Sequence, residues 1–341
     1  MLNLVKELCA LSGVSSFEEP VRDFIRQRVA PYADEVRVDA LGNLIVFKKG
    51  KKSTGSRFVV CAHMDEVGLM VRRITPEGYL KVTTVGGIDR RVLIGKPVKV
   101  GPNEVPGVIG LKAYHLVSDE EEKRVPKLEE LSIDIGAGSK EEAEALVSLG
   151  DCVVFDSDCV EFGQGMLKAK ALDDRIGCAV MMKLLEEELP LDVTFVFAVQ
   201  EEVGNRGAFG AAFSVKPEAA LVLETTTAAD LPGMEDHQKV CLPGKGPVVP
   251  FMDMGSIADR EYYRLLRDLA RENGIPWQTK HYLSGGNDAA AFQRSRTGVR
   301  TATIAAAVRY LHAPASVCAI RDLEDILKLS RLFLGAMAEG L

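Results

Sequence analysis

The sequence has no long apolar run, no C-x-x-C pair and no excess of basic charge. No hydrophobic stretch approaches the roughly 20 residues that a membrane-spanning helix needs, so we expect no such helix. The first residues, "MLNLVKELCALSG", mix charged and apolar positions and lack the small-residue cleavage site of a signal peptide. These absences together predict a cytoplasmic protein.

The charge balance and the cysteines narrow the range of partners and compartments. The net charge of −7 and the isoelectric point near 5.5 argue against nucleic acid or an anionic membrane as a partner, because both require a basic surface. The seven cysteines are odd in number and lie mostly in apolar segments, such as Val59-Val60-Cys61. They are typical of reduced core residues in a reducing compartment.

At 341 residues, the chain is longer than a typical single core, which predicts either two domains or one domain with an insertion. From residue 173 onward, predicted helices and strands alternate. The helices cover 174–188, 206–214, 260–273 and 322–338, and the strands cover 192–199, 219–224 and 300–307. This alternation predicts an α/β fold with a largely parallel sheet. Helices at 3–11 and 17–29, and two short strands around "DALGN", precede it.

The segment 67–166 has a different character. It contains short β runs separated by Gly, Pro and Asn, as in "KPVKVGPNEVPGVIGLK", and only 140–148 has the pattern of a helix. Such a pattern is typical of a small barrel or sandwich. We therefore expect an α/β domain made of 1–66 and 167–341, interrupted by an inserted β-rich domain at 67–166.

The stretch "VVCAHMDEVGLMV", residues 59–71, places His63 between an apolar strand and two carboxylates, Asp65 and Glu66. An imidazole that binds a metal usually donates its other N–H to a carboxylate or a carbonyl, so Asp65 is a candidate partner for a ligating His63. Taken alone, a histidine of this kind is more often a surface residue in a polar turn than a metal ligand. The other ligands have to come from elsewhere in the chain.

Four further motifs place acidic or imidazole side chains at predicted strand ends. They contain Asp173 and Asp174, Glu201 and Glu202, Glu224, and His312. Taken singly, each residue has an ordinary explanation as a helix cap, a loop start, a surface acid or a turn residue. In a parallel sheet, however, the carboxyl ends of the strands meet at one edge, so these side chains should gather there. Imidazole and carboxylate ligands without a thiolate suit Zn²⁺, Co²⁺ or Mn²⁺.

The motifs AHMDEVG, ALDDR, QEEVG-x-RGA, ETTTAADLPG, GGNDAAAF and RYLHAP together resemble those of the tetrahedral aminopeptidases. This family of dinuclear metallopeptidases includes glutamyl and deblocking aminopeptidases. The resemblance spans almost the whole chain and extends into the insertion. It implies a zinc-peptidase type of α/β fold and the removal of N-terminal residues from peptides. It also implies that the insertion drives dimerisation, and that the dimers assemble into a tetrahedral dodecamer.

The same resemblance implies roles for single residues. It implies two divalent metal ions per subunit, zinc or cobalt, with manganese as an alternative. The implied metal ligands are His63, Asp173 as the bridge, Glu202, Glu224 and His312. Glu201 would be the general base, and Asp65 would orient His63. A cis peptide bond between Asp173 and Asp174 is also implied.

Two positions depart from the pattern of the relatives. Glu224 stands where many relatives have Asp, and the extra methylene puts metal spacing and metal preference in question. Asn287 stands in the glycine-rich loop where relatives often have Thr. Neither change removes a type of ligand.

Two other functions are compatible with parts of the sequence. A glycoside hydrolase could use Glu201 and Glu202 as its acid and base, but adjacent residues are poorly placed to flank a glycosidic bond, and the histidines would have no role. A non-catalytic assembly or binding protein would be expected to have lost a ligand or the base. The sequence therefore favours the metalloaminopeptidase.

Overall fold

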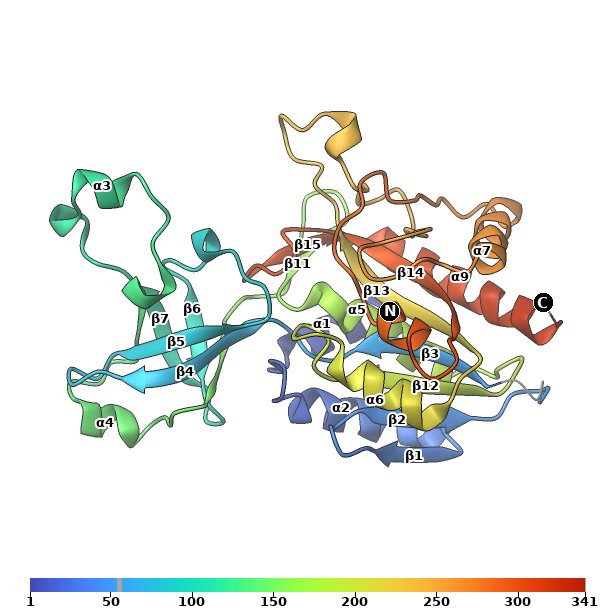
Figure 1. The fold of residues 1–341 in the computed structure, drawn as a ribbon, viewed down its shortest axis with the longest axis horizontal. Coiled ribbons are helices and arrows are strands. Elements are labelled where there is room, and N and C mark those ends of the chain that lie inside the picture. The colour runs from blue at the N-terminus through green and yellow to red at the C-terminus, as the bar shows by residue number, and fades with distance from the viewer. Residues whose placement is uncertain (54–56, 341) are drawn as a thin grey trace.

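The computed structural model describes residues 1–53 and 57–340, and the chain forms two lobes along its long axis (Figure 1). The larger lobe contains both ends of the described chain, and the smaller lobe contains the strands between residues 68 and 155. The expected α/β domain also includes 54–56 and Leu341, which lie outside the described residues. No helix in the described part of the chain is long and apolar enough to cross a membrane.

Within the described residues, a nine-stranded mixed sheet forms the centre of the larger lobe. Its strands, in spatial order, are β1 (Glu35–Val38), β2 (Leu44–Lys48), β12 (Val193–Ala198), β3 (Phe58–His63), β13 (Ala219–Thr227), β14 (Arg300–Arg309), β15 (Ser316–Ala319), β11 (Met166–Ala169) and β10 (Val160–Phe162). The four central strands β12, β3, β13 and β14 are parallel, and the flanking strands pair antiparallel. The predicted α/β class is confirmed, and the sheet is mixed, with the parallel pairing concentrated where the strands are most buried.

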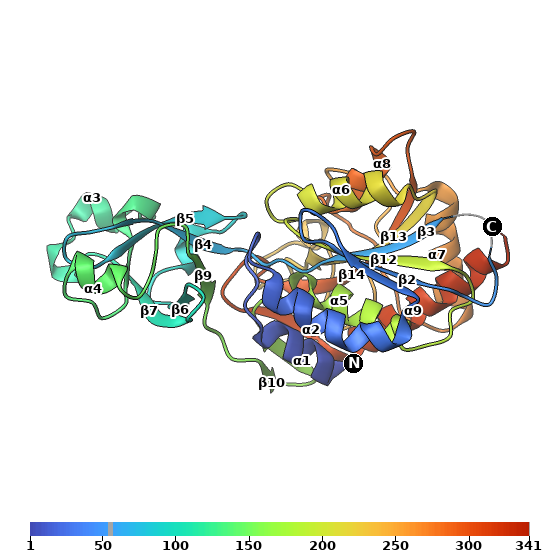
Figure 2. The ribbon, with the colours of Figure 1, turned by 90° about the horizontal axis from the view of Figure 1, so that it is seen from below.

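Helices cover both faces of this sheet (Figure 2). One face carries α1 (Leu2–Ala10), α2 (Glu19–Val29), α5 (Leu172–Leu185), α7 (Arg260–Glu272) and α9 (Ile320–Ala338), and the other carries α6 (Arg206–Val215) and α8 (Ala289–Gln293). Strand β3 shows how the faces are divided. Val60 and Ala62 join the core with α5 and α9, whereas Val59 and Cys61 join the core with α6 and α8. Because side chains alternate along a strand and both faces of the sheet are covered, β3 is apolar from Phe58 to Ala62, and only its last residue, His63, is polar.

The predicted long helices are present, within a few residues of their expected ends. Helix α7 begins where the Asp259 carboxylate accepts hydrogen bonds from the backbone N–H groups of Glu261 and Tyr262, which is the usual role of an N-terminal cap. The short helix α8 was not predicted. Its buried sequence, Ala-Ala-Ala-Phe-Gln, is too short to show a helical period.

The smaller lobe is a closed barrel, which decides between the barrel and the sandwich that the sequence left open. Its strands, in spatial order, are β4 (Gly68–Ile74), β5 (Leu80–Val85), β8 (Ser132–Asp134), β7 (Val105–Gly110), β6 (Pro97–Val100) and β9 (Cys152–Phe155). It has its own apolar core, the short helix α4 (Lys140–Glu144) packs against β4, and α3 (Asp119–Glu122) lies on a loop that projects from the barrel. The chain then rejoins the large sheet at β10. The functional division into domains at 66/67 and 166/167 stays a prediction.

A buried ion cluster fixes the point where the chain leaves the large sheet for the barrel. Glu66 Oε1 accepts hydrogen bonds from Lys170 Nζ at 2.6 Å, from Arg175 Nη2 at 3.3 Å and from the backbone N–H of Gly13 at 3.1 Å. All three charged side chains are buried. A buried ion pair that loses one partner typically costs about 3–5 kcal/mol, so this cluster strongly favours one path for the chain between the lobes.

Candidate metal site

The register of the parallel strands brings the acidic and imidazole side chains to one edge of the sheet. His63 is the last residue of β3, and it pairs with Ala198, the last residue of β12. Strand β13 pairs with β3 as far as Val222 and Cys61. Two residues further along each strand stand Glu224 and His63, on the same face of the sheet because side chains alternate. Sequence-distant residues are thereby placed next to each other.

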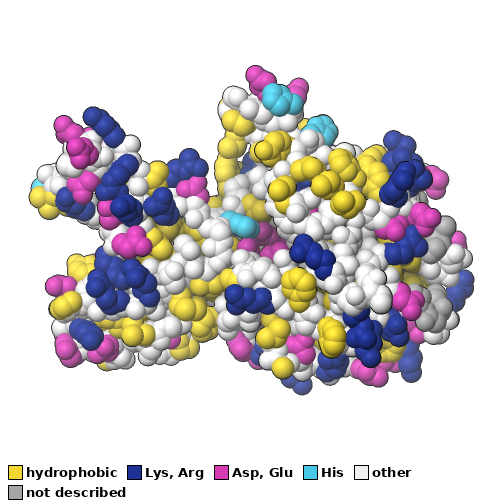
Figure 3. All heavy atoms as spheres, viewed as in Figure 1, with side chains coloured by type: hydrophobic (Ala, Val, Ile, Leu, Met, Phe, Trp, Pro, Cys, Tyr) yellow, Lys and Arg dark blue, Asp and Glu magenta, His cyan; other side chains and the backbone are white. Residues whose placement is uncertain are grey.

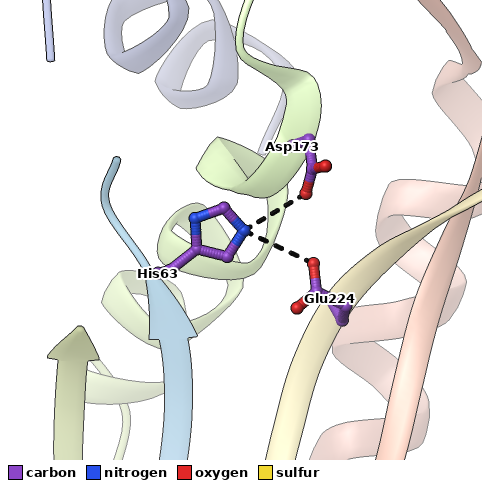
Figure 4. A group of neighbouring side chains, drawn as sticks. All are labelled: His63, Asp173 and Glu224. Carbon is purple, nitrogen blue, oxygen red and sulfur yellow. Dashed lines mark hydrogen bonds and ion pairs between the residues drawn. The ribbon is translucent and has the colours of Figure 1, made fainter. Parts of the chain in front are cut away.

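A first group of possible ligands forms around His63 (Figure 4). The Nε2 atom of His63 lies 3.2 Å from Oδ1 of Asp173 and 3.5 Å from Oε1 of Glu224. Asp173 comes from the start of α5, and Glu224 comes from β13. The three ligand atoms lie within 4.8 Å of one another, an arrangement that could hold a metal ion.

A second group shares Asp173 with the first. His312, which follows β14, places its Nε2 atom 3.4 Å from Oδ2 of Asp173 and 3.2 Å from Oε2 of Glu202. Asp173 therefore presents one oxygen to each imidazole. Two adjacent groups that share a carboxylate have the donor arrangement of a two-metal site.

Both imidazoles are oriented by contacts at their other nitrogen. The Nδ1 atom of His63 lies 3.1 Å from the backbone oxygen of Asp65 and 3.3 Å from its Oδ1 atom. The Nδ1 atom of His312 lies 2.9 Å from the backbone oxygen of Gly87, in the segment between β5 and β6 of the smaller lobe. In each ring, a proton on Nδ1 leaves Nε2 free to act as a ligand. The insertion thus contributes directly to the site.

Asp65 connects the first imidazole to the glutamate pair. Its buried carboxylate accepts hydrogen bonds from Ser15 Oγ at 2.6 Å and from the backbone N–H groups of Glu201 at 3.0 Å and Glu202 at 3.2 Å. Strand β12 has already ended at this point, and Gln200 takes a left-handed backbone conformation with φ at 56°. Two neighbouring glutamates can therefore both turn towards the site, which a regular strand would not allow.

The electrostatics of the site show an excess of buried negative charge. Burial raises the pKa of Glu202 to about 8 and that of Glu224 to about 7. Burial also acts to raise the pKa of Asp173, but hydrogen bonds from His312 and His63 outweigh it and hold this pKa well below its ordinary value. In His312 the hydrogen bond with Asp173 overcomes the effect of burial and raises the pKa to about 9. Divalent cations would compensate this surplus of carboxylates.

Glu201 stands beside the two groups and belongs to neither, among the described residues. Its Oε1 atom accepts a hydrogen bond of 3.0 Å from Asn205 Nδ2. Burial raises the pKa of Glu201 well above its usual value, and the charges of Glu224 and Asp288 add to that effect. The two neighbouring glutamates therefore have different partners: the carboxylate of Glu201 contacts Asn205, whereas that of Glu202 contacts His312.

All seven residues singled out from the sequence lie at this edge, and Figure 3 shows acidic side chains gathered beside a histidine in a hollow of the surface. The cis peptide bond between Asp173 and Asp174 is confirmed. Sequence reasoning missed Gly87, Asn205 and Asp288. The last two lie within QEEVGNRGA and GGNDAAAF, motifs that carried the resemblance without a role for either residue.

Comparisons with known proteins show a family and several solved structures to which the chain is similar. The sequence profile of the M42 glutamyl aminopeptidase family matches residues 42–329. A putative aminopeptidase of Acetivibrio thermocellus is 39% identical over 331 residues, which cover 96% of this chain and 97% of the relative. The TET aminopeptidase from the marine sediment archaeon Thaumarchaeota archaeon SCGC AB-539-E09 superposes with a TM-score of 0.94 at 34% identity, covering 99% and 98% of the two chains. The Pyrococcus horikoshii TET1 peptidase, described as assembling into a tetrahedron or a large octahedral shell, superposes with a TM-score of 0.86 at 36% identity and covers 98% of each chain.

The contacts of Asp65 predict that metal affinity depends on its charge. Asp65→Asn keeps the size of the side chain but removes the negative charge beside Nδ1 of His63. We therefore expect metal affinity to fall by about 10- to 100-fold. Metal content after dialysis against graded chelator concentrations measures this change. Asp322→Asn is the matched control, since Asp322 is also buried and also accepts two backbone N–H groups, from Gly244 and Gly246. Equal metal retention in both variants would contradict the role given to Asp65.

Proposed function

The chain belongs to the M42 glutamyl aminopeptidase family, and on that premise we propose a two-metal mechanism for its aminopeptidase activity. One observation carries the proposal above all others. Asp173 lies between His63 and His312, with one carboxylate oxygen near each Nε2 atom. A carboxylate shared in this way suits two cations about 3.5–4 Å apart.

We assign the ligands by the two groups described above. His63 and Glu224 would hold one ion, His312 and Glu202 would hold the other, and Asp173 would contribute one carboxylate oxygen to each. The donor set of imidazole and carboxylate oxygens fits zinc or cobalt, with manganese as an alternative. Two such ions would polarise the scissile carbonyl and lower the pKa of a water molecule beside it.

Glu201 is the proposed general base. Its Oε1 atom is held by Asn205, so Oε2 is the atom that takes the proton from the attacking water and passes it to the leaving amine. The backbone N–H of Glu201 is fixed by Asp65, which also orients His63. The base and the first imidazole are therefore positioned by the same residue.

The glycoside hydrolase alternative fits the geometry less well. A retaining glycosidase places its two carboxyl groups about 5–5.5 Å apart on either side of the bond to be broken. Here Glu202 Oε2 lies 3.2 Å from His312 Nε2, while Glu201 is hydrogen-bonded to Asn205. A glycosidase mechanism would leave His63, His312 and Asp173 without a function.

Removal of metal distinguishes these two functions. Stripping the protein with phenanthroline or EDTA should abolish hydrolysis of amino-acid p-nitroanilides, and reloading with Zn²⁺, Co²⁺ or Mn²⁺ should restore it, because ordinary two-carboxylate glycosidases need no metal. A panel of different N-terminal residues, measured in the same assay, gives the preferred substrate. Full peptidase activity at less than about a tenth of a metal ion per chain would contradict a mechanism with two metals.

Amide substitutions separate the base from its neighbouring ligand. We expect Glu201→Gln to keep both metals and substrate binding while kcat falls by about 10²–10⁴-fold, the usual cost of a lost general base. Glu202→Gln should lose metal first, because it removes a ligand of the second ion. Metal content by atomic emission and kcat are measured on both variants, with neither substitution changing side-chain size. If Glu201→Gln loses metal while Glu202→Gln keeps it, the two roles are exchanged.

We also propose that the barrel lobe drives assembly into dimers and then a tetrahedral dodecamer. The relative from Pyrococcus horikoshii supports this by its described tetrahedral and octahedral shells. The barrel lobe projects from the larger lobe and carries exposed apolar side chains, including Tyr114 at 80% and Leu116 at 59% exposure. Exposed apolar side chains of this kind often mark interaction surfaces.

The seven free cysteines support the cytoplasm as the compartment.

Charged substitutions on the barrel test this assembly more cleanly than deletion, because deletion would also remove Gly87 from the site. Replacing both Tyr114 and Leu116 by Lys should reduce the particle mass measured by light scattering, since burying two charges at an interface is costly. Phe213→Lys on α6, where the ring is 65% exposed, serves as the control and should leave the mass unchanged. A persistent large assembly in the double variant would place the contact elsewhere.

A further inference from the structure

We infer that Asn205 and Asp288 are positioning residues that hold the carboxylate of Glu201 in place for proton transfer. The inference rests on the proposed function of Glu201 as the base. Asn205 Nδ2 donates to Oε1 of Glu201 at 3.0 Å and to Oδ1 of Asp288 at 3.0 Å. The two hydrogens of one amide group are thus shared between two carboxylates, and the amide is fixed from both sides.

The Asn205 side chain contacts Glu201 and Asp288 instead of capping the helix that follows it. Asn205 occupies the N-terminal cap of α6, where an Asn side chain normally accepts a hydrogen bond from the first turn of the helix. It makes no such capping bond. Its backbone is left-handed, with φ at 55°, a conformation that Asn tolerates better than most residues. The backbone N–H groups of Gly204 and Asn205 both donate to the backbone oxygen of Glu201 at 2.9 Å, which closes the turn.

Asp288 is the buried acceptor that fixes the position of the Asn205 amide. Its side chain is 1% exposed, and its Oδ2 atom lies 3.7 Å from the Sγ atom of Cys61 in β3. Its backbone oxygen accepts the N–H groups of Ala291 and Phe292 in the first turn of α8. Cys61 belongs to the same strand as His63, two residues earlier. The amide therefore locates Glu201 relative to the strand that carries the first imidazole.

A carboxylate on a short turn has rotational freedom that catalysis does not tolerate. Asn205 holds Oε1 of Glu201 by a hydrogen bond. Because the carboxylate is planar and rigid, fixing Oε1 also restricts the position of Oε2. A displacement of about 1 Å at a reacting group can reduce the rate by about 100-fold. Asn205 and Asp288 do not contact the reacting atoms in this scheme, and they act only through Glu201.

Asn205→Gly tests the first residue without straining the backbone, because glycine accepts positive φ. We expect kcat to fall by about 10- to 100-fold, as for other outer contacts of an active site, with metal content and KM within about twofold of the parent. Asn273→Gly is the matched control, since Asn273 caps the C-terminal end of α7 and is exposed. An unchanged kcat in Asn205→Gly would overturn the inference.

A double-mutant cycle separates positioning from a general structural effect. In the Glu201→Gln background the base is already lost, so adding Asn205→Gly should change the residual kcat by less than about twofold. Equal fold losses in the two backgrounds would overturn the inference, because they would mean that Asn205 acts independently of Glu201. Asp288→Asn, which keeps an oxygen acceptor for Asn205, should recover most of the kcat that Asp288→Ala loses. Equal losses in the two Asp288 variants would contradict the acceptor role.

The same set of variants distinguishes failure of the inference from failure of the proposed function. If Glu201→Gln itself retains kcat, Glu201 is not the base and the proposed mechanism fails. If Glu201→Gln loses kcat and Asn205→Gly does not, the mechanism stands and only the positioning role is wrong.

Discussion

Mutual repulsion among buried carboxylates at one edge of the sheet is the constraint on which the rest of the structure depends. Asp65, Asp173, Glu202 and Glu224 all approach the two imidazoles, and two like charges about 4 Å apart repel by about 4 kcal/mol at an effective dielectric constant of 20. Backbone N–H groups and imidazoles offset part of this cost. Divalent cations would offset the remainder, so metal binding and folding should be thermodynamically linked.

Only a parallel arrangement could bring these groups together from such distant parts of the chain. The four central strands end at the same edge, and each contributes a proposed ligand or leads into a segment that does. The barrel is coupled to this edge at two points. Gly87 orients His312 through its backbone oxygen, and Glu66 anchors the chain where it enters the barrel. The lobe proposed to direct assembly therefore also supplies a contact to the site, and the proposed assembly would be linked through Gly87 to the orientation of one imidazole.

The sequence predicted those members of the candidate site that have an acidic or imidazole side chain near the end of an apolar strand, such as His63 and Glu224. It did not reveal Gly87, because an accepting backbone oxygen has no sequence signature. It also missed the contact between Asn205 and Asp288, which are 83 positions apart and meet only because α6 and α8 pack on the same face of the sheet. Helix α8 is too short to be recognised by its period, so the helix that begins directly after Asp288 was absent from the predicted fold.

The contacts of Glu224 show how a glutamate can be accommodated at the position where the resemblance led us to expect aspartate. The longer side chain could have extended its carboxylate past His63. Instead, Oε1 accepts a hydrogen bond of 2.9 Å from the backbone N–H of the next residue, Thr225, and remains 3.5 Å from Nε2 of His63. The carboxylate is folded back towards its own strand, which takes up the length of the extra methylene. A proposed ligand held by its own backbone has little freedom to move, so glutamate in place of aspartate would alter the position of one oxygen while leaving the number and type of proposed ligands unchanged.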